Sequence, residues 1–337
     1  MSIYASLETT IAQLTASHKG ILAADESITT IGKRFSTIGL ASTPETRRDY
    51  RALLLTTPHI EQLISGVILF EETLGQSDQQ ATPFTTLLRA RNIIPGIKVD
   101  TGLTTLPFTA EEKITQGLDG LADRLQHYYQ AGARFAKWRA VFTVSETLPS
   151  TLAIEANATA LAHYAALCQT NGLVPIVEPE VLMEGDHELA RCAEVSTVVL
   201  HTVFKELFSY HVIPEYIILK PNMVLAGQAS PTPKPNIEAV AQATLKVLRQ
   251  TVPAAVPSIN FLSGGQTPEI ATAHLNAINC QGRQPWRLNF SYGRALQDPV
   301  LKTWKGQAIN IQAAQEALYH RAHLNVLAAQ GKCPMTC

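Results

Sequence analysis

The chain has 337 residues, of which 46% are hydrophobic and 16% are charged, as is ordinary for a soluble globular enzyme. The formal net charge of −1 provides no long-range field that would hold nucleic acid or an anionic membrane. No run of 18 apolar residues predicts a transmembrane helix, and residues 1–19 lack the basic start and apolar centre of a signal peptide. The five cysteines form no CxxC pair, which argues against a zinc knuckle or a disulfide framework and favours the reducing cytoplasm.

The first predicted element is a short helix near the N-terminus, because Leu7, Ile11 and Leu14 recur at helical spacing. Eight short apolar runs follow it, and each has the length and residue types of a buried strand. The runs are Gly20–Asp25, Gly66–Glu72, Ile94–Asp100, Phe135–Ala140, Val174–Glu180, Tyr216–Asn222, Ser258–Gly265 and Arg287–Arg294. Their starts lie 28 to 46 residues apart, which leaves room for a helix between successive strands.

Segments with helical periodicity lie between the apolar runs. Clear examples are Pro44–Leu55, Gln116–Ala131, Leu152–Asn171, Glu188–Ser209 and Ile237–Thr251. Eight such units predict an α/β fold, a single (β/α)8 TIM barrel domain over residues 1–337, with an extra C-terminal helix at about 311–329 and a short tail at 331–337. A doubly wound sheet is the rival architecture, but it often carries a Gly-rich first turn, and no GxGxxG or GxxxxGK(S/T) motif occurs here.

Polar or charged residues end nearly every predicted strand. In a barrel, the C-terminal ends of the strands meet at one mouth, where active sites lie. Burying a charged group there without water or a partner would cost free energy, so one shared site explains these residues better than an independent origin for each. The residues are Asp25, Glu71, Lys98, Asp100, Lys137, Arg139, Glu178, Glu180, Lys220, Asn222, Ser263, Ser291 and Arg294.

This mixture of cations and carboxylates permits two kinds of chemistry. Positive charge can hold phosphates. A lysine that is partly buried and crowded by other cations has a lowered pKa, so its neutral amine can attack a ketone and form a Schiff base. Lys220 is the strongest candidate for this nucleophile, because it stands in Leu219–Asn222 directly after an apolar run. Neighbouring carboxylates can move the protons that carbinolamine dehydration and C–C cleavage require.

Two segments with small residues predict a phosphate site. Ser263 and Gly264 lie in the seventh run, and Ser291, Gly293 and Arg294 end the eighth. The loops after strands seven and eight are the usual phosphate site of a (β/α)8 barrel. Glycine lets backbone N–H groups approach an anion, serine adds a hydroxyl, and arginine adds a bidentate cation.

Each candidate also has a purely structural interpretation. A lone lysine at a strand end is more often a salt-bridged rim residue, and Glu178 and Glu180 could pair with Lys137 or Arg139 without any catalytic role. Ser263 could cap the next helix. A catalytic metal would need histidine ligands that converge at the mouth, but none of the ten histidines ends a predicted strand. The sequence therefore predicts no metal, and it predicts no other cofactor.

Several strings of residues resemble class I fructose-1,6-bisphosphate aldolases. They are GILAADES at 20–27, GVILFEETL at 66–74, GIKVD at 96–100, QGLDGL at 116–121, FAKWR at 135–139, NGLVPIVEPE at 171–180, LKPNMV at 219–224, FLSGGQ at 261–266 and NFSYGRALQ at 289–297. They occur in the family's order and extend the resemblance from about Lys19 to about Gly331.

The resemblance implies a (β/α)8 barrel, usually a cytoplasmic homotetramer, that acts on a sugar bisphosphate in glycolysis and gluconeogenesis. The implied reaction is the reversible cleavage of fructose 1,6-bisphosphate to dihydroxyacetone phosphate and glyceraldehyde 3-phosphate. It implies no cofactor and no nucleic-acid or membrane partner.

The resemblance also implies roles for individual residues. Lys220 is the Schiff-base lysine, Glu178 the general acid and base, Asp25 assists C–C cleavage, Lys137 polarises the substrate, and Glu180 positions the lysines. The site for the phosphate of the ketone half comprises Ser263, Gly264, Ser291, Gly293 and Arg294. The site for the other phosphate comprises Ser27, Arg34, Lys98 and Arg139.

Three departures from the family pattern bear on function. Ile28–Thr30 replaces a glycine-containing loop, which predicts a stiffer segment at the second phosphate. Glu71 stands where many animal members have histidine, and the tail at 331–337 lacks the terminal tyrosine that exchanges the enamine proton in many relatives. Alternative hypotheses are the same chemistry on sedoheptulose 1,7-bisphosphate or fructose 1-phosphate, or a non-catalytic scaffold that kept the barrel.

Overall fold

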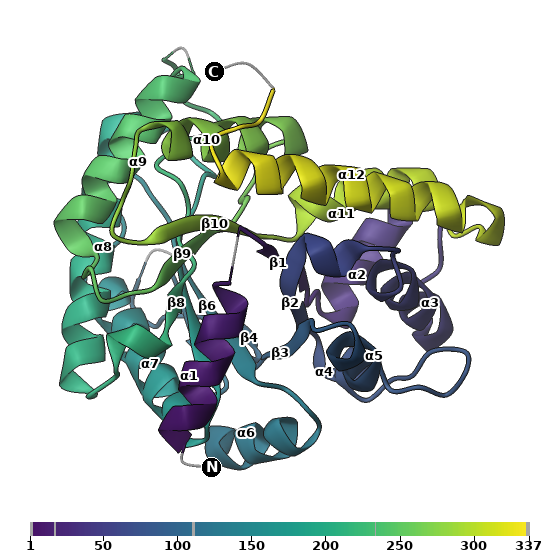
Figure 1. The fold of residues 1–337 in the computed structure, drawn as a ribbon. Coiled ribbons are helices and arrows are strands. Elements are labelled where there is room, and N and C mark those ends of the chain that lie inside the picture. Colours follow the sequence, from purple (N-terminus) through teal and green to yellow (C-terminus); the bar gives the residue numbers. More distant parts are fainter. Residues whose placement is uncertain (1–2, 17, 110–111, 233, 335–337) are drawn as a thin grey trace.

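The computed structural model describes residues 3–16, 18–109, 112–232 and 234–334. Eight parallel strands close a barrel, in the order β1-β10-β9-β8-β7-β6-β3-β2 (Figure 1). The strands are β1 (Gly20–Ala24), β2 (Ile64–Leu69), β3 (Ile94–Lys98), β6 (Phe135–Phe142), β7 (Val174–Val181), β8 (Ile218–Leu219), β9 (Ser258–Phe261) and β10 (Arg287–Tyr292). Each of the eight apolar runs therefore overlaps one barrel strand, and the predicted (β/α)8 fold is confirmed.

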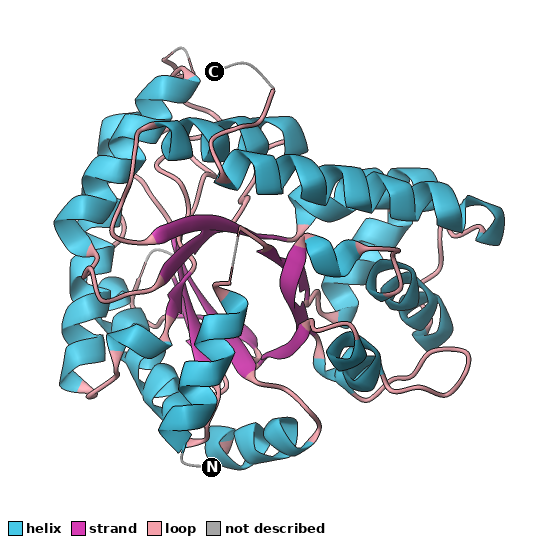
Figure 2. Ribbon diagram, viewed as in Figure 1, coloured by secondary structure: helices cyan, strands magenta, loops and turns pink. Residues whose placement is uncertain are grey.

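Helices surround the barrel on its outside, and one further helix, α1, lies at an end of the barrel (Figure 2). They are α1 (Ile3–Leu14), α2 (Ile28–Ser36), α3 (Pro44–Leu55), α4 (Glu71–Leu74), α5 (Phe84–Ala90), α6 (Leu121–Gln130), α7 (Thr151–Thr170), α8 (Leu189–Ser209), α9 (Ile237–Thr251), α10 (Pro268–Cys280), α11 (Arg294–Trp304) and α12 (Ile311–Ala329). The tail predicted at 331–337 is described up to position 334, and its last three residues lie outside the described part. Within that part, no helix is long and apolar enough to cross a membrane.

Helix α1 closes one end of the barrel. Its Leu7 and Leu14 are buried in one cluster with inward-facing strand residues such as Ile68, Phe135 and Ile176. In Figure 1, α1 lies in front of the strands at this end. The apolar plug leaves the C-terminal ends of the strands as the open mouth of the barrel, where the polar residues gather.

A two-stranded hairpin is the main element that the sequence patterns missed. Strands β4 (Gly102–Thr105) and β5 (Lys113–Gln116) pair in antiparallel register, with Gly102 opposite Gln116. The prediction of a helix from Gln116 is therefore wrong at its start, because α6 begins only at Leu121. Gly120, with φ of 63°, precedes that helix in the left-handed region, which glycine adopts without strain.

Several predicted strands end earlier in the structure, and two of these differences have a clear local cause. The second ends at Leu69, and Glu71 begins α4 instead of ending the strand. The sixth shrinks to Ile218–Leu219, because Tyr216 belongs to a 3₁₀ turn and Pro221 has no N–H for the sheet. Lys220 still joins the barrel, because its backbone N–H donates to the carbonyl of Val177 at 2.8 Å.

Candidate active site

A cavity of about 720 Å³ opens at the mouth of the barrel. It is lined from all eight strand ends or the loops that follow them. The structure brings every predicted site residue into this one cavity, namely Asp25, Ser27, Arg34, Lys98, Lys137, Arg139, Glu178, Glu180, Lys220, Ser263, Gly264, Ser291, Gly293 and Arg294. These residues are up to 269 positions apart in the chain, since the range runs from 25 to 294.

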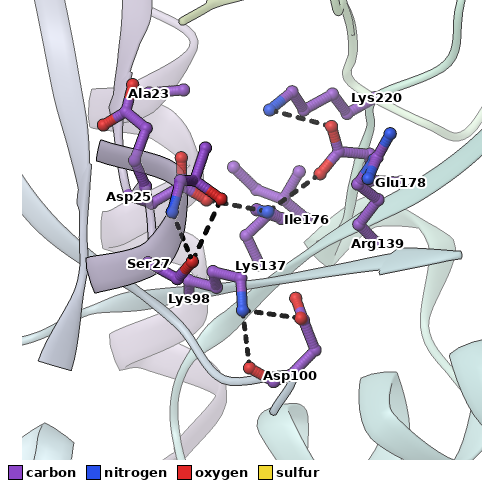
Figure 3. A network of polar contacts seen from close by, with 12 residues as sticks. Ala23, Asp25, Ser27, Lys98, Asp100, Lys137, Arg139, Ile176, Glu178 and Lys220 are labelled. Carbon is purple, nitrogen blue, oxygen red and sulfur yellow. Dashed lines mark hydrogen bonds and ion pairs between the residues drawn. The ribbon is translucent and has the colours of Figure 1, made fainter. Parts of the chain in front are cut away.

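The deepest part of the cavity holds a chain of alternating charges (Figure 3). Glu178 lies between two lysines, with Lys220 Nζ 3.1 Å from its Oε1 and Lys137 Nζ 3.2 Å from its Oε2. Lys137 Nζ also lies 2.7 Å from Asp25 Oδ2. Lys220, Lys137 and Glu178 are all buried, so these ion pairs are shielded from solvent.

Strand alternation explains why these side chains point inward. Lys137 and Arg139 are two positions apart on β6, and Glu178 and Glu180 are two apart on β7, so each pair shares one face of the barrel wall. The intervening Trp138 points outward and stacks on Tyr164 of α7, with ring centroids 5.5 Å apart. The outward packing therefore sets the register that turns the charged residues into the cavity.

The electrostatics of this cluster favour fully ionised carboxylates. Burial opposes ionisation of Asp25, but the positive charges of Lys137, Lys220 and Lys98 outweigh it and lower the pKa of the carboxyl. The pKa of Glu178 is lowered in the same way, since burial is outweighed by Lys137, Lys220 and Arg139. Burial acts to deprotonate Lys137, but Asp25 and Glu178 outweigh burial and raise the pKa of its ammonium group. Lys137 is thus a permanent cation at neutral pH.

Two further ion pairs occupy the wall of the cavity. Arg139 Nε lies 2.5 Å from Glu180 Oε2, and Lys98 Nζ lies 2.6 Å from Asp100 Oδ1. The resemblance implied that Glu180 positions the lysines. In the described residues, its ion pair is with Arg139 and none is formed with a lysine. Glu180 therefore orients a predicted phosphate contact.

The loops after β9 and β10 form one end of the cavity. Gly293 precedes the first residue of α11, and no side chain caps that helix, so its first N–H groups are available to an anion. Ser291 is buried, and its hydroxyl has no hydrogen-bond partner among the described residues. Ser263 does not cap the next helix, because Thr267 is the N-cap of α10. An open helix start and an unpaired buried hydroxyl fit a phosphate group.

A second end of the cavity is built around α2, which follows β1, the neighbour of β10 in the barrel. Ser27 caps this helix, accepting a hydrogen bond from the N–H of Thr30 at 3.2 Å. The segment Ile28–Thr30 is the first turn of α2, so the expectation of a stiffened loop there is corrected to a helix start. Arg34 lines the cavity from the same helix, and its Nη1 lies 2.5 Å from Glu26 Oε1.

Sequence patterns missed several residues of the cavity. Glu26 follows Asp25 directly, and no pattern above predicts a role for it, although its buried carboxylate binds both Arg34 and Arg51. A second acidic residue beside a strand-end aspartate was the available signal. Glu71, by contrast, is one of the polar residues predicted at the mouth, and it lies at the cavity wall and accepts a hydrogen bond from the Tyr128 hydroxyl at 3.0 Å. In the described part of the chain, no group of three or more metal-ligating side chains comes together.

Known proteins match this chain over nearly its whole length. The sequence profile described as fructose-bisphosphate aldolase class-I matches residues 6–336. A Xanthomonas campestris protein named probable fructose-bisphosphate aldolase class 1 is 51% identical over 333 residues, covering 98% of this chain and 99% of the relative. An Arabidopsis thaliana protein named fructose-bisphosphate aldolase 6, cytosolic, is 52% identical over 314 residues, covering 93% and 87% of the two chains.

The fold is also that of a solved structure. A ternary complex of Plasmodium falciparum fructose-bisphosphate aldolase with TRAP and a small-molecule inhibitor aligns with a TM-score of 0.96 and 51% identity. The alignment covers 98% of this chain and 95% of that one.

Proposed function

This chain belongs to the class I fructose-bisphosphate aldolase family, whose members are carbon–carbon lyases, and from that premise we propose how its own residues carry the reaction. Lys220 is the Schiff-base nucleophile, and Glu178 moves its protons. The observation that supports this assignment best is the position of the Glu178 carboxylate between Lys220 and Lys137 at the buried end of the cavity. A single carboxylate there reaches both the attacking amine and the group that polarises the ketone.

The first half of the reaction forms the iminium. Glu178 accepts a proton from the Lys220 ammonium group 3.1 Å away, and the neutral amine adds to the C2 carbonyl carbon of the sugar. The Lys137 cation stabilises the developing oxyanion, which then takes a proton from the adduct's own ammonium nitrogen and becomes the carbinolamine hydroxyl. Protonated Glu178 then donates its proton to this hydroxyl, which leaves as water while the C2=N bond forms.

The second half breaks the C3–C4 bond. Asp25, ionised beside Lys137, removes the proton of the C4 hydroxyl, and the C4 oxygen forms the carbonyl of glyceraldehyde 3-phosphate. The electron pair of the broken bond moves into the iminium, giving an enamine on Lys220. C3 gains one proton, equal in number to the one that Asp25 removed, and one water hydrolyses the Schiff base, which releases dihydroxyacetone phosphate and restores the free lysine.

The two ends of the cavity suit the two phosphates of the substrate. Ser263, Gly264, Ser291, Gly293 and Arg294 hold the phosphate on the ketone half. Ser27, Arg34, Lys98 and Arg139 hold the phosphate on the aldehyde half. Cations at both ends supply the local positive charge that a chain with a net charge of −1 otherwise lacks.

Trapping the Schiff base tests this proposal. Dihydroxyacetone phosphate and borohydride should label the protein once per chain, and peptide mapping should place the adduct on Lys220. Lys220→Met should abolish labelling and turnover, whereas Lys246→Met, at an exposed position on α9, should label normally. A chelator should leave activity unchanged. An adduct on another lysine would overturn the assignment, as would normal turnover by the Lys220→Met variant.

The alternative substrates, sedoheptulose 1,7-bisphosphate and fructose 1-phosphate, differ from fructose 1,6-bisphosphate in the aldehyde half of the molecule. A polar first turn of α2, rich in hydroxyl groups, borders the site proposed for the aldehyde-side phosphate and would also suit a longer sugar. Measured kcat/KM values for fructose 1,6-bisphosphate, fructose 1-phosphate and sedoheptulose 1,7-bisphosphate should be highest for the first. A clear preference for the seven-carbon sugar would favour that alternative.

The proposal includes the oligomeric state of the enzyme and its compartment in the cell. The family resemblance supports a homotetramer, for which analytical ultracentrifugation should give four times the chain mass of 36.7 kDa. The cytosolic name of the Arabidopsis thaliana relative supports a cytoplasmic enzyme, and cell fractionation would test it.

A further inference from the structure

A buried polar network lies at the wall of the cavity, outside the catalytic cluster. Its centre is Glu26, whose carboxylate binds Arg34 Nη1 at 2.5 Å and Arg51 Nη1 at 2.7 Å. The amide of Gln297 donates a third contact to Glu26 Oε1 at 2.8 Å. Arg51, Glu26 and Gln297 are all buried, whereas Arg34 reaches into the cavity.

Gln297 connects this centre to three separate elements. Its Nε2 also donates to the carbonyl of Ala23 at 2.6 Å, on β1 two residues before Asp25. Its Oε1 accepts a hydrogen bond from the Tyr50 hydroxyl of α3 at 3.0 Å. Gln297 itself belongs to the first turn of α11, the helix that begins at Arg294. One fully buried side chain therefore joins the helix at the ketone-side phosphate to the carboxylate that holds Arg34.

We propose that Glu26 and Gln297 are positioning residues that fix the two phosphate contacts relative to each other. Glu26 orients the Arg34 guanidinium toward the aldehyde-side phosphate. Gln297 holds α11, and with it Gly293 and Arg294, at a set distance from Glu26. This inference rests on the phosphate assignments proposed above and adds two residues that do not touch the substrate in those assignments.

This network can strengthen substrate binding as well as stabilise the fold. An arginine side chain has many rotamers, and fixing it before binding removes the entropy cost that a flexible contact would add. A charge-assisted bond to a buried carboxylate fixes both its position and its charge. The bisphosphate spans both ends of the cavity, so its affinity depends on their separation, whereas a monophosphate uses only one end.

Two substrates separate a positioning role from a structural one. Fructose 1,6-bisphosphate uses both ends, and fructose 1-phosphate carries its phosphate only on the ketone half. Glu26→Gln should raise KM for the bisphosphate roughly tenfold or more, the size expected for a lost bond to a charged group. Its KM for fructose 1-phosphate should change less than about twofold, and kcat should be nearly unchanged for both.

A double-mutant cycle tests whether Glu26 acts through Arg34. In the Arg34→Met background, Glu26→Gln should raise KM for the bisphosphate no further, because the contact that it positions is already gone. Glu26→Asp, which keeps the charge, should restore part of the lost affinity. Additive effects in the cycle, or equal KM changes for both sugars in the Glu26→Gln variant, would overturn the proposal.

Gln297→Met supplies a second variant that keeps the side-chain length and leaves the buried charges paired. Because it releases α11 as well as Glu26, it should raise KM for both sugars. All variants should be measured below their melting temperatures, and all should still be labelled at Lys220 by saturating dihydroxyacetone phosphate and borohydride. Loss of that labelling in the unmodified enzyme would contradict the proposed function, whereas normal labelling with unchanged KM values in Glu26→Gln and Gln297→Met would contradict only this inference.

Discussion

At the scale of single residues, the site depends on shared carboxylates. Glu178 forms ion pairs with two lysines, and Glu26 with two arginines, so each of these two buried carboxylates is matched by more than one cation. Such pairs are costly to break on one side, because the remaining charge is left buried without a partner. Each carboxylate therefore sets both the position and the protonation state of its neighbours.

Glu178→Gln should show the proton-transfer role directly. The amide cannot accept the Lys220 proton, so kcat should fall by roughly 10²- to 10⁴-fold, the usual contribution of general acid–base catalysis. The rate of borohydride trapping with dihydroxyacetone phosphate should fall in parallel. Glu184→Gln, an exposed position on the loop after β7, is the matched control and should leave both rates unchanged. A variant with near-normal kcat would remove Glu178 from the mechanism.

At the scale of elements, the helices at the two ends of the barrel have different tasks. At the mouth, α2 and α11 present their first turns to the cavity, so their positions matter for binding. At the other end, α1 plugs the barrel with apolar side chains and contributes nothing to the cavity lining. Changes in α1 should therefore affect stability and leave the chemistry intact.

Leu14→Ala tests this separation. Leu14 is 1% exposed, and truncating a buried leucine costs about 2–5 kcal/mol of unfolding free energy. Urea denaturation should show this loss, while KM and kcat of the folded enzyme stay at wild-type values. Ile3→Ala, at a position 48% exposed on the same helix, should change stability by less than about 0.5 kcal/mol. A KM change in Leu14→Ala would mean that the plug also shapes the mouth.

At the scale of the whole molecule, the charged cluster makes stability depend on pH. The pKa values of Asp25 and Glu178 are lower in the folded chain than their ordinary values of 3.8 and 4.5. A carboxyl with a lowered folded pKa binds protons more readily when unfolded. Its stabilising contribution is therefore present at neutral pH and is lost as the pH falls through and below these ordinary values.

The unfolding free energy should accordingly decrease below about pH 5. Asp25→Asn removes one of the two groups, so this variant should be less stable at pH 7 and show a shallower decrease toward acid. Urea unfolding at pH 7, 5 and 4 measures how steeply the unfolding free energy falls with pH in the wild-type protein and in the variant. An equally steep decrease in the variant would place the acid sensitivity elsewhere in the molecule.

Sequence patterns were most informative where local rules act alone. Periodicity located all eight strands, and the strand ends pointed to Lys220, Glu178, Lys137 and Asp25, because a charged residue after an apolar run is a local signal. Boundaries were less accurate. The end of the second strand at Leu69 and the hairpin before α6 depend on pairing with distant segments, which a local pattern does not contain.

The sequence by itself determined the barrel and the kinds of side chain at its mouth. Only the tertiary structure decided how those charges pair. The resemblance implied that Glu180 positions lysines, whereas its ion pair is with Arg139. The sequence predicted no role for Glu26, whose carboxylate lies between Arg34 and Arg51. The physical reason is that an ion pair requires two atoms within about 4 Å, and the partner of each carboxylate lies on another element, such as β6, α2 or α3, whose position only the packed fold sets.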